Sequence, residues 1–173
     1  MDATLALVAQ HRAIEGLFDE VAGEGRRRAR SSLVSRLAEE LIAHLAAEEA
    51  VFYPSVRPFL EGLLDPSDLG RDEHLLLRTG LRTVLKTSAG DRAFGERIAA
   101  LQVLFAEHVR REEGVFFPRV VRALSEAQRD MLGEEILASR PHVWIVTTEG
   151  KAPLYAERQW PLRSRVSVLL SAG

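Results

Sequence analysis

The sequence predicts an all-α protein: an antiparallel, up-down-up-down four-helix bundle with a short fifth helix and a C-terminal extension. Apolar residues recur three or four positions apart along four long segments, which is the spacing of a helix with one buried face. The connections between these segments are short, so consecutive helices are expected to pack antiparallel. A pattern, His-x-x-x-Glu-Glu-x-Val-Phe-aromatic-Pro, begins at His44 and again at His108, 64 residues later. This repeat indicates a duplicated pair of helices.

Four long segments are expected to be helical. They cover residues 3–22, 29–61, 66–88 and 92–124. Pro54 lies inside the second and Pro118 inside the fourth, and each is expected to bend or break its helix, because proline lacks an N–H and its ring clashes with the preceding turn. Near these prolines the α-helical period predicts which residues face the bundle core. They are Val51, Phe52 and Ser55 in the second helix and Val115, Phe116 and Arg119 in the fourth.

A fifth, shorter helix is expected to follow the bundle and to end near Ser139. The run Ser125-Glu-Ala-Gln128 has the form of a capping box, in which a serine and a glutamine satisfy free backbone donors at the start of a helix. Residues 1–139 are therefore expected to form one bundle domain, and residues 140–173 a separate C-terminal extension.

The C-terminal extension has a different character. Three runs are rich in β-branched, aromatic or aliphatic residues and are strand-like: His142–Thr148, Leu154–Glu157 and Val166–Leu170. A lone hairpin is marginal in water, so a β-ribbon here would have to pack on the bundle or on a partner subunit. The alternative is that part of the extension is disordered. The strands are a candidate dimer contact, and both a monomer and a homodimer remain open.

Composition excludes several classes of function. The chain has 173 residues and a formal net charge of −2, so it lacks the positive electrostatic potential that attracts nucleic acid. It has no cysteine, which excludes thiolate ligands, disulfides and iron–sulfur clusters. No apolar run approaches the ~20 residues of a membrane span. The first residues lack a basic segment followed by an apolar one, so no signal peptide is expected. The sequence therefore predicts a cytoplasmic protein without nucleic-acid or membrane partners.

The duplicated pattern places chemistry on the bundle's inner face. On a helix, residues i and i+4 share one side, so each copy projects an imidazole and a carboxylate together. The helix before each copy also carries a histidine, His11 in the first half and His74, 63 residues later, in the second. The resulting set is His11, His44, Glu48, His74, His108 and Glu112.

A metal site explains this set better than an ordinary core does. A single histidine on an apolar stripe is more often a core or surface residue than a ligand. Here both copies place His and Glu where the stripe calls for leucine, and burying an unpaired carboxylate costs several kcal/mol. If the four imidazoles and two carboxylates bind the same cations in the bundle core, the charge of the cations offsets the cost of burying the carboxylates. Imidazole and carboxylate without thiolate favour iron or manganese, with zinc as a further alternative.

The duplication predicts two equivalent metal positions. His11 and His44 would serve one, His74 and His108 the other, with Glu48 and Glu112 bridging between them. Six protein groups cannot fill two six-coordinate ions, which leaves positions for a solvent bridge and a small ligand.

Neighbouring residues have weaker claims. Glu49 and Glu113 point about 100° further round the helix, so they are expected in solvent or behind the ligands. Glu15 stands four residues after His11 but has no equivalent in the second half, where Arg78 takes that place. The aromatic residues of the two repeats are expected to form core and pocket wall. Tyr53 differs from them in carrying a hydroxyl that could hydrogen-bond a bound oxygen species.

Over about residues 1–139, these repeats and the upstream histidines resemble the hemerythrin-like family, the HHE cation-binding domains. The resemblance implies a four-helix bundle with a non-haem di-iron centre, whose ligands fall on the six residues already named. Oxygen-carrying hemerythrins have a fifth histidine and an aspartate, whereas here the fifth histidine, His142, lies beyond the bundle. The ferritin-like alternative uses Glu-x-x-His, and this chain shows His-x-x-x-Glu instead.

The resemblance also implies a function. It indicates two iron ions with a bridging oxo or hydroxo group, and binding or sensing of oxygen, nitric oxide or peroxide at an open iron position. Two alternatives stand beside this one: a peroxide-consuming di-iron enzyme, and an iron-responsive interaction module. A ligand-binding or sensing protein is favoured over a dedicated enzyme, and turnover with peroxide would distinguish the two.

Overall fold

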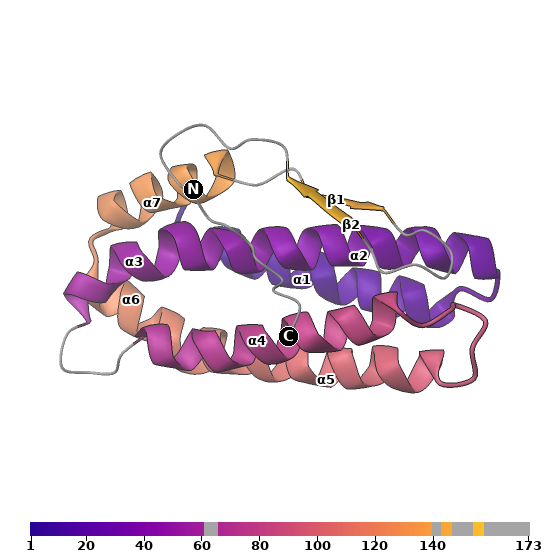
Figure 1. The fold of residues 1–173 in the computed structure, drawn as a ribbon. Helices are drawn as coiled ribbons and strands as arrows, with labels where there is room; N and C mark the ends of the chain where they lie inside the picture. Colours follow the sequence, from indigo (N-terminus) through magenta and orange to yellow (C-terminus); the bar gives the residue numbers. More distant parts are fainter. Residues whose placement is uncertain (61–65, 140–142, 147–153, 158–173) are drawn as a thin grey trace.

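The computed structural model describes residues 1–60, 66–139, 143–146 and 154–157 (Figure 1). The bundle has four helical arms. The first arm is α1 (Ala3–Gly23), and the second consists of α2 (Arg27–Ala47), η1 (Glu48–Phe52), α3 (Tyr53–Val56) and η2 (Arg57–Phe59). The third arm is α4 (Pro66–Leu85), and the fourth consists of α5 (Phe94–Arg111), η3 (Glu112–Phe116) and α6 (Phe117–Ala123). Contacts join α1 to α2, α2 to α4, α4 to α5 and α5 to α1, which closes the ring of an up-down-up-down bundle. The predicted fold class is confirmed.

The fifth helix, α7 (Glu126–Ala138), packs against α1 and against the turn η1. Its start is the expected capping box: the Ser125 hydroxyl accepts from the Gln128 backbone N–H, and the Gln128 side chain accepts from the Ser125 N–H. Gly133 faces the start of α1 so closely that an added Cβ would lie 1.9 Å from the Met1 carbonyl oxygen. The absence of a side chain at this position therefore allows α7 to dock.

The two prolines of the repeats do not break their helices. Each follows a π-helical turn, η1 before Pro54 and η3 before Pro118, and the chain remains helical on both sides. In these wider turns the backbone N–H of the residue five positions later bonds to the Glu48 or the Glu112 carbonyl. A wider turn relieves the clash between the proline ring and the preceding turn, which explains why the chain stays helical where a break was one of the two expected outcomes.

The π turns also change which residues face inward. A π turn holds one residue more than an α turn, so the helix beyond it is rotated relative to a continuous α-helical stripe. Val51, Phe52 and Phe116 are buried as expected, but Val115 is 43% exposed and Ser55 and Arg119 are only half-buried, so the expected stripe is wrong at these last three positions. The residues that are buried in their place are Tyr53, Val56, Phe117 and Val120.

The bundle core consists of two apolar clusters with a polar layer between them. One cluster includes Ile14, Leu41 and Phe105, and the other includes Leu7 and Phe116. The histidines fall between the clusters along the helices. On α1, for example, the order is Leu7, His11, Ile14. The apolar clusters therefore keep water away from the polar layer on both sides.

Part of the C-terminal extension forms the expected ribbon. Strands β1 (Val143–Val146) and β2 (Leu154–Glu157) pair antiparallel, with Trp144 opposite Ala156, and β1 lies beside α2 (Figure 1). The other strand-like run, Val166–Leu170, and His142 lie outside the described residues. Among the described helices, none is both long enough and apolar enough to cross a membrane.

Candidate metal centre

The six predicted ligands come from all four arms of the bundle and meet in its centre. Helix α1 supplies His11, α2 supplies His44, α4 supplies His74 and α5 supplies His108. Glu48 and Glu112 are the first residues of the two π turns. All six side chains are buried, with relative exposures between 0% and 4%.

Each glutamate lies between the two halves of the duplication. Glu48 places Oε1 3.1 Å from Nε2 of His44, in its own half, and Oε2 3.2 Å from Nε2 of His74, in the other half. Glu112 places Oε2 3.3 Å from Nε2 of His11 and 3.6 Å from Nε2 of His108. Glu48 therefore presents one oxygen to each half, whereas Glu112 presents the same oxygen, Oε2, to both halves.

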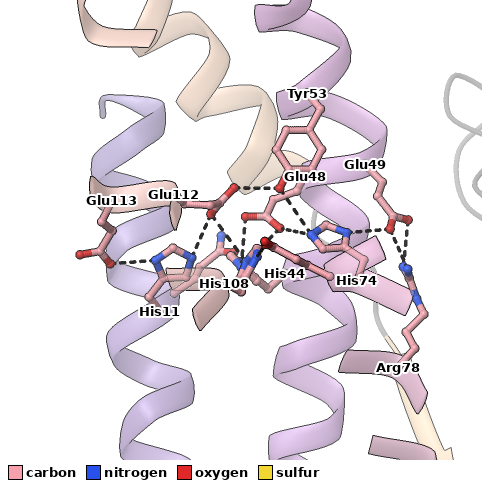
Figure 2. A network of polar contacts seen from close by, with 12 residues as sticks. His11, His44, Glu48, Glu49, Tyr53, His74, Arg78, His108, Glu112 and Glu113 are labelled. Atoms are coloured by element: carbon pink, nitrogen blue, oxygen red, sulfur yellow. Dashed lines mark hydrogen bonds and ion pairs between the residues drawn. The ribbon is translucent and has the colours of Figure 1, made fainter. Parts of the chain in front are cut away.

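The four imidazoles turn the same ring nitrogen, Nε2, toward the centre (Figure 2). The ring centroids are 4.7 Å apart for His11 and His44 and 5.2 Å apart for His74 and His108, and between the halves they are 5.5 Å apart for His44 and His108. The assignment of one histidine pair to each metal position therefore stays a prediction. Ligand atoms of five of the six residues lie within 4.8 Å of one another; the five are His11, His44, Glu48, His108 and Glu112. His74 joins this group through Glu48.

Several of the converging atoms have no hydrogen-bond partner within the described part of the chain. They are Nε2 of His11, both carboxylate oxygens of Glu48 and Oε2 of Glu112. Buried polar atoms are normally paired, because an unpaired one costs about 1–3 kcal/mol or more. Four such atoms facing one point fit a bound cation. The donors are imidazole nitrogen and carboxylate oxygen only, a set that suits iron, manganese or zinc.

The pKa shifts describe the centre without a cation. Burial and the neighbouring Glu112 raise the pKa of Glu48 well above its ordinary value of 4.5. Burial and the other histidines lower the pKa of His44 well below 6.5, and burial also lowers that of His74. Burial opposes ionisation of Glu112, but the nearby His108 and His11 outweigh it and lower its pKa to about 2. A cation that binds here therefore finds the imidazoles of His44 and His74 neutral and displaces a proton from Glu48.

Tyr53 reaches the centre from the residue just after the first π turn. Its hydroxyl donates a hydrogen bond of 2.8 Å to Oε1 of Glu112 and lies 3.4 Å from Nε2 of His74. Burial and the two central glutamates raise the pKa of Tyr53 well above 10, so it keeps its proton. Its counterpart in the second repeat, Phe117, has no hydroxyl and stacks on His11. The two halves therefore differ at this position.

Glu49 and Glu113 lie behind the ligands, as expected. Glu113 accepts from Nδ1 of His11 at 2.9 Å, and Glu49 accepts from Nδ1 of His74 at 2.7 Å (Figure 2). Each glutamate supports the histidine of the other half. Arg12 pairs with Glu113, and Arg78 pairs with both oxygens of Glu49. Burial opposes ionisation of Glu49, but the His74 and Arg78 hydrogen bonds hold its pKa at about 2.

The sequence did not lead us to expect two further residues that lie behind ligand histidines, Gln10 and Glu73. Oε1 of Gln10 lies 3.0 Å from Nδ1 of His44, and Oε2 of Glu73 lies 3.5 Å from Nδ1 of His108. Each stands immediately before the upstream histidine of its half, so the duplication itself held the signal. Glu15 takes no part, because it pairs with Arg12 at the surface.

Comparison with known proteins agrees with this architecture. The family model "Hemerythrin HHE cation binding domain" matches residues 2–120. The chain belongs to the hemerythrin HHE family. The resemblance stated from the sequence is therefore confirmed.

A solved structure of an HHE cation-binding domain-containing protein from Mycobacterium kansasii superposes with a TM-score of 0.71. The two sequences are 21% identical, and the match covers 80% of this chain and 84% of that one, so the fold is shared. A protein named DNA nickase from Nostoc sp. (strain PCC 7120) is 28% identical over 133 residues. That match takes in 77% of this chain but only 37% of the relative's length.

Proposed function

We propose that this HHE domain is a non-haem di-iron protein that binds or senses oxygen, nitric oxide or peroxide. The two ions would be held by the residues that converge in the bundle: His11, His44, Glu48, His74, His108 and Glu112. The observation that carries the proposal is the group of buried nitrogen and oxygen atoms without partners, contributed by both halves and facing one point. Six protein groups leave coordination positions for a bridging oxo or hydroxo group and for a small ligand.

Bound iron would supply redox chemistry and open coordination positions for a diatomic or peroxide ligand. The chain's own residues set the conditions for that chemistry. The apolar clusters on either side exclude water from the centre, and Glu49 and Glu113 fix the orientation of His74 and His11. Tyr53 holds a proton at its hydroxyl oxygen, within reach of Glu112 and beside His74.

The test is the metal content per chain, together with the absorption spectrum in air, of protein expressed with iron. The expected result is two irons per chain with absorption bands of an oxo bridge in the near ultraviolet, followed by spectral changes on adding oxygen, nitric oxide or peroxide. A single zinc ion per chain, or a stable fold without metal, would contradict the di-iron proposal. Manganese at both positions would keep the site but change its chemistry.

The second candidate is a peroxide-consuming enzyme at the same centre, and the Tyr53 hydroxyl favours it. A hydrogen-bond donor beside the site would stabilise the negative charge that develops on a peroxide oxygen, and Tyr53 is a buried hydroxyl in that position. Steady-state loss of peroxide under multiple turnovers distinguishes this activity from reversible binding. Stoichiometric binding without turnover would leave the sensing proposal alone.

Nucleic acid is not among the proposed substrates, although the Nostoc relative is named a DNA nickase. The formal net charge of −2 gives little attraction for a polyanion. The iron-loaded protein is expected to leave supercoiled plasmid intact on an agarose gel. Conversion of the plasmid to its open-circular form would contradict this expectation.

A further inference from the structure

The ligand histidines of the two halves differ in what supports them. In one half, Nδ1 of His74 is hydrogen-bonded to the Glu49 carboxylate at 2.7 Å, and Nδ1 of His108 has the Glu73 carboxylate at 3.5 Å, an ion-pair distance without a hydrogen bond between the two groups. In the other half, His11 has a carboxylate, whereas His44 has the neutral amide of a glutamine.

The glutamine is the only place where this pattern of support departs from the duplication among the four ligand histidines. Gln10 lies 3.0 Å from Nδ1 of His44, at the position that Glu73 occupies in the other half. Glu113, at 2.9 Å from Nδ1 of His11, corresponds to Glu49. The difference between the halves is therefore one carboxylate.

The Glu73 carboxylate acts on His108 through its charge. A negative charge beside Nδ1–H makes the opposite nitrogen, Nε2, a stronger donor to a metal ion, and the neutral amide oxygen that Gln10 places beside Nδ1 of His44 does so less. Loss of such an outer carboxylate typically weakens metal binding by about 10- to 100-fold. Each of the three carboxylates is paired with an arginine, Arg12 with Glu113, Arg78 with Glu49 and Arg111 with Glu73. Arg111 pairs with Oε1 of Glu73, so the oxygen that acts on His108 is the other one, Oε2, at 3.5 Å from Nδ1.

We propose that Glu73 is a positioning residue that makes the two metal positions unequal, so that the position beside His74 and His108 binds its ion more tightly and fills first. The inference rests on the proposed two-metal centre. Gln10 defines the weaker position, beside His11 and His44.

The test uses the full-length, metal-free protein titrated with cobalt(II) without oxygen, in competition with a chromophoric chelator. The wild type is expected to bind in two resolved steps. Cobalt(II) is paramagnetic and shifts the Nδ1–H proton signals of the histidines it binds, so NMR reports which histidines are occupied first. His74→Ala should remove the tight step, and His11→Ala should remove the weak one.

Substitutions that remove the Glu73 carboxylate or move it to position 10 supply the matched controls. Glu73→Gln should weaken the first step by about 10- to 100-fold, and Glu73→Asp should restore part of the loss. The double variant Gln10→Glu/Glu73→Gln should reverse the order of filling, a result that a merely structural role of Glu73 would not produce. Thermal unfolding of each metal-free variant checks that the bundle is intact.

Two equal binding steps in the wild type, or an unchanged order of filling in the double variant, would overturn the inference while leaving the two-metal centre standing. Absence of a second cobalt ion at saturation would overturn the proposed function and this inference together.

Discussion

The Tyr53 hydroxyl donates a 2.8 Å hydrogen bond to Oε1 of Glu112, although the two residues belong to different halves of the duplication. Glu112 thus has one oxygen held by the protein and the other, Oε2, facing the histidines without a hydrogen-bond partner among the described residues. The bond orients the carboxylate toward the centre and places a proton donor at its edge.

Replacement of Tyr53 by phenylalanine tests the role of this hydroxyl. The variant should retain two metal ions, because the hydroxyl is not among the proposed ligands, and should lose peroxide turnover or change its ligand spectra. The metal-free protein should lose about 1–3 kcal/mol of unfolding free energy, because Oε1 of Glu112 is left unpaired. Phe117→Tyr, at the equivalent position beside His11, is the matched control. Unchanged peroxide reactivity in Tyr53→Phe would exclude the hydroxyl from the chemistry.

Gly70→Ala should disturb the same tyrosine from the neighbouring helix. A Cβ at position 70 would lie 2.6 Å from Cε2 and 2.9 Å from Cζ of Tyr53, so the phenol ring must move. Overpacking of this kind costs about 1–3 kcal/mol, partly offset by the better helix propensity of alanine. Gly16→Ala, whose Cβ would meet nothing within 4 Å, should instead stabilise the protein slightly. Urea denaturation compares the two variants, and equal stability would contradict the packing argument.

Glu48→Ala and His108→Ala should each lower metal affinity by more than ~100-fold, because direct ligands matter more than the carboxylates behind them. Metal analysis after desalting measures the loss. Glu15→Ala is the control, since Glu15 lies at the surface and pairs with Arg12. Retention of two metal ions per chain in both ligand variants would refute the ligand assignment.

The stability of the metal-free protein should fall as the pH drops below the ordinary histidine pKa of 6.5. Burial lowers the pKa of His44 and His74 in the folded protein, so the unfolded chain binds up to two protons that the folded chain does not. Glu48 acts in the opposite direction, because burial raises its pKa and the folded state keeps a proton that the unfolded chain releases above pH 4.5. The net difference is about one proton, or about 1.4 kcal/mol per pH unit.

Glu48→Gln separates these opposing contributions. Without the Glu48 proton the stability of the metal-free protein should fall more steeply, by up to about 2.7 kcal/mol per pH unit between about pH 5 and 6.5. Urea denaturation at several pH values gives both slopes. Equal slopes in the wild type and the variant would show that Glu48 does not carry the proton.

The helices and the six central residues were predictable because they depend on period and repetition. The i, i+4 spacing of His44 and Glu48 fixes their common face, and recurrence in the second half excludes coincidence. Whether the six bind metal remains a prediction. An α-helical period could not predict which residues face the core at and beyond the π turns, because each π turn holds one extra residue. Ser55 and Val115 were therefore expected on the wrong face of the helix.

The amino-acid sequence by itself determined the bundle, its duplicated halves and the buried imidazole–carboxylate set, because helical period and repetition are local properties of the chain. Only the tertiary structure decided which atoms meet. Glu48 joins His44 to His74, and Glu113 supports His11 from the opposite half, across long separations in sequence. Such contacts depend on how four helices pack together, and the unequal roles of Gln10 and Glu73 become visible only when that packing is known.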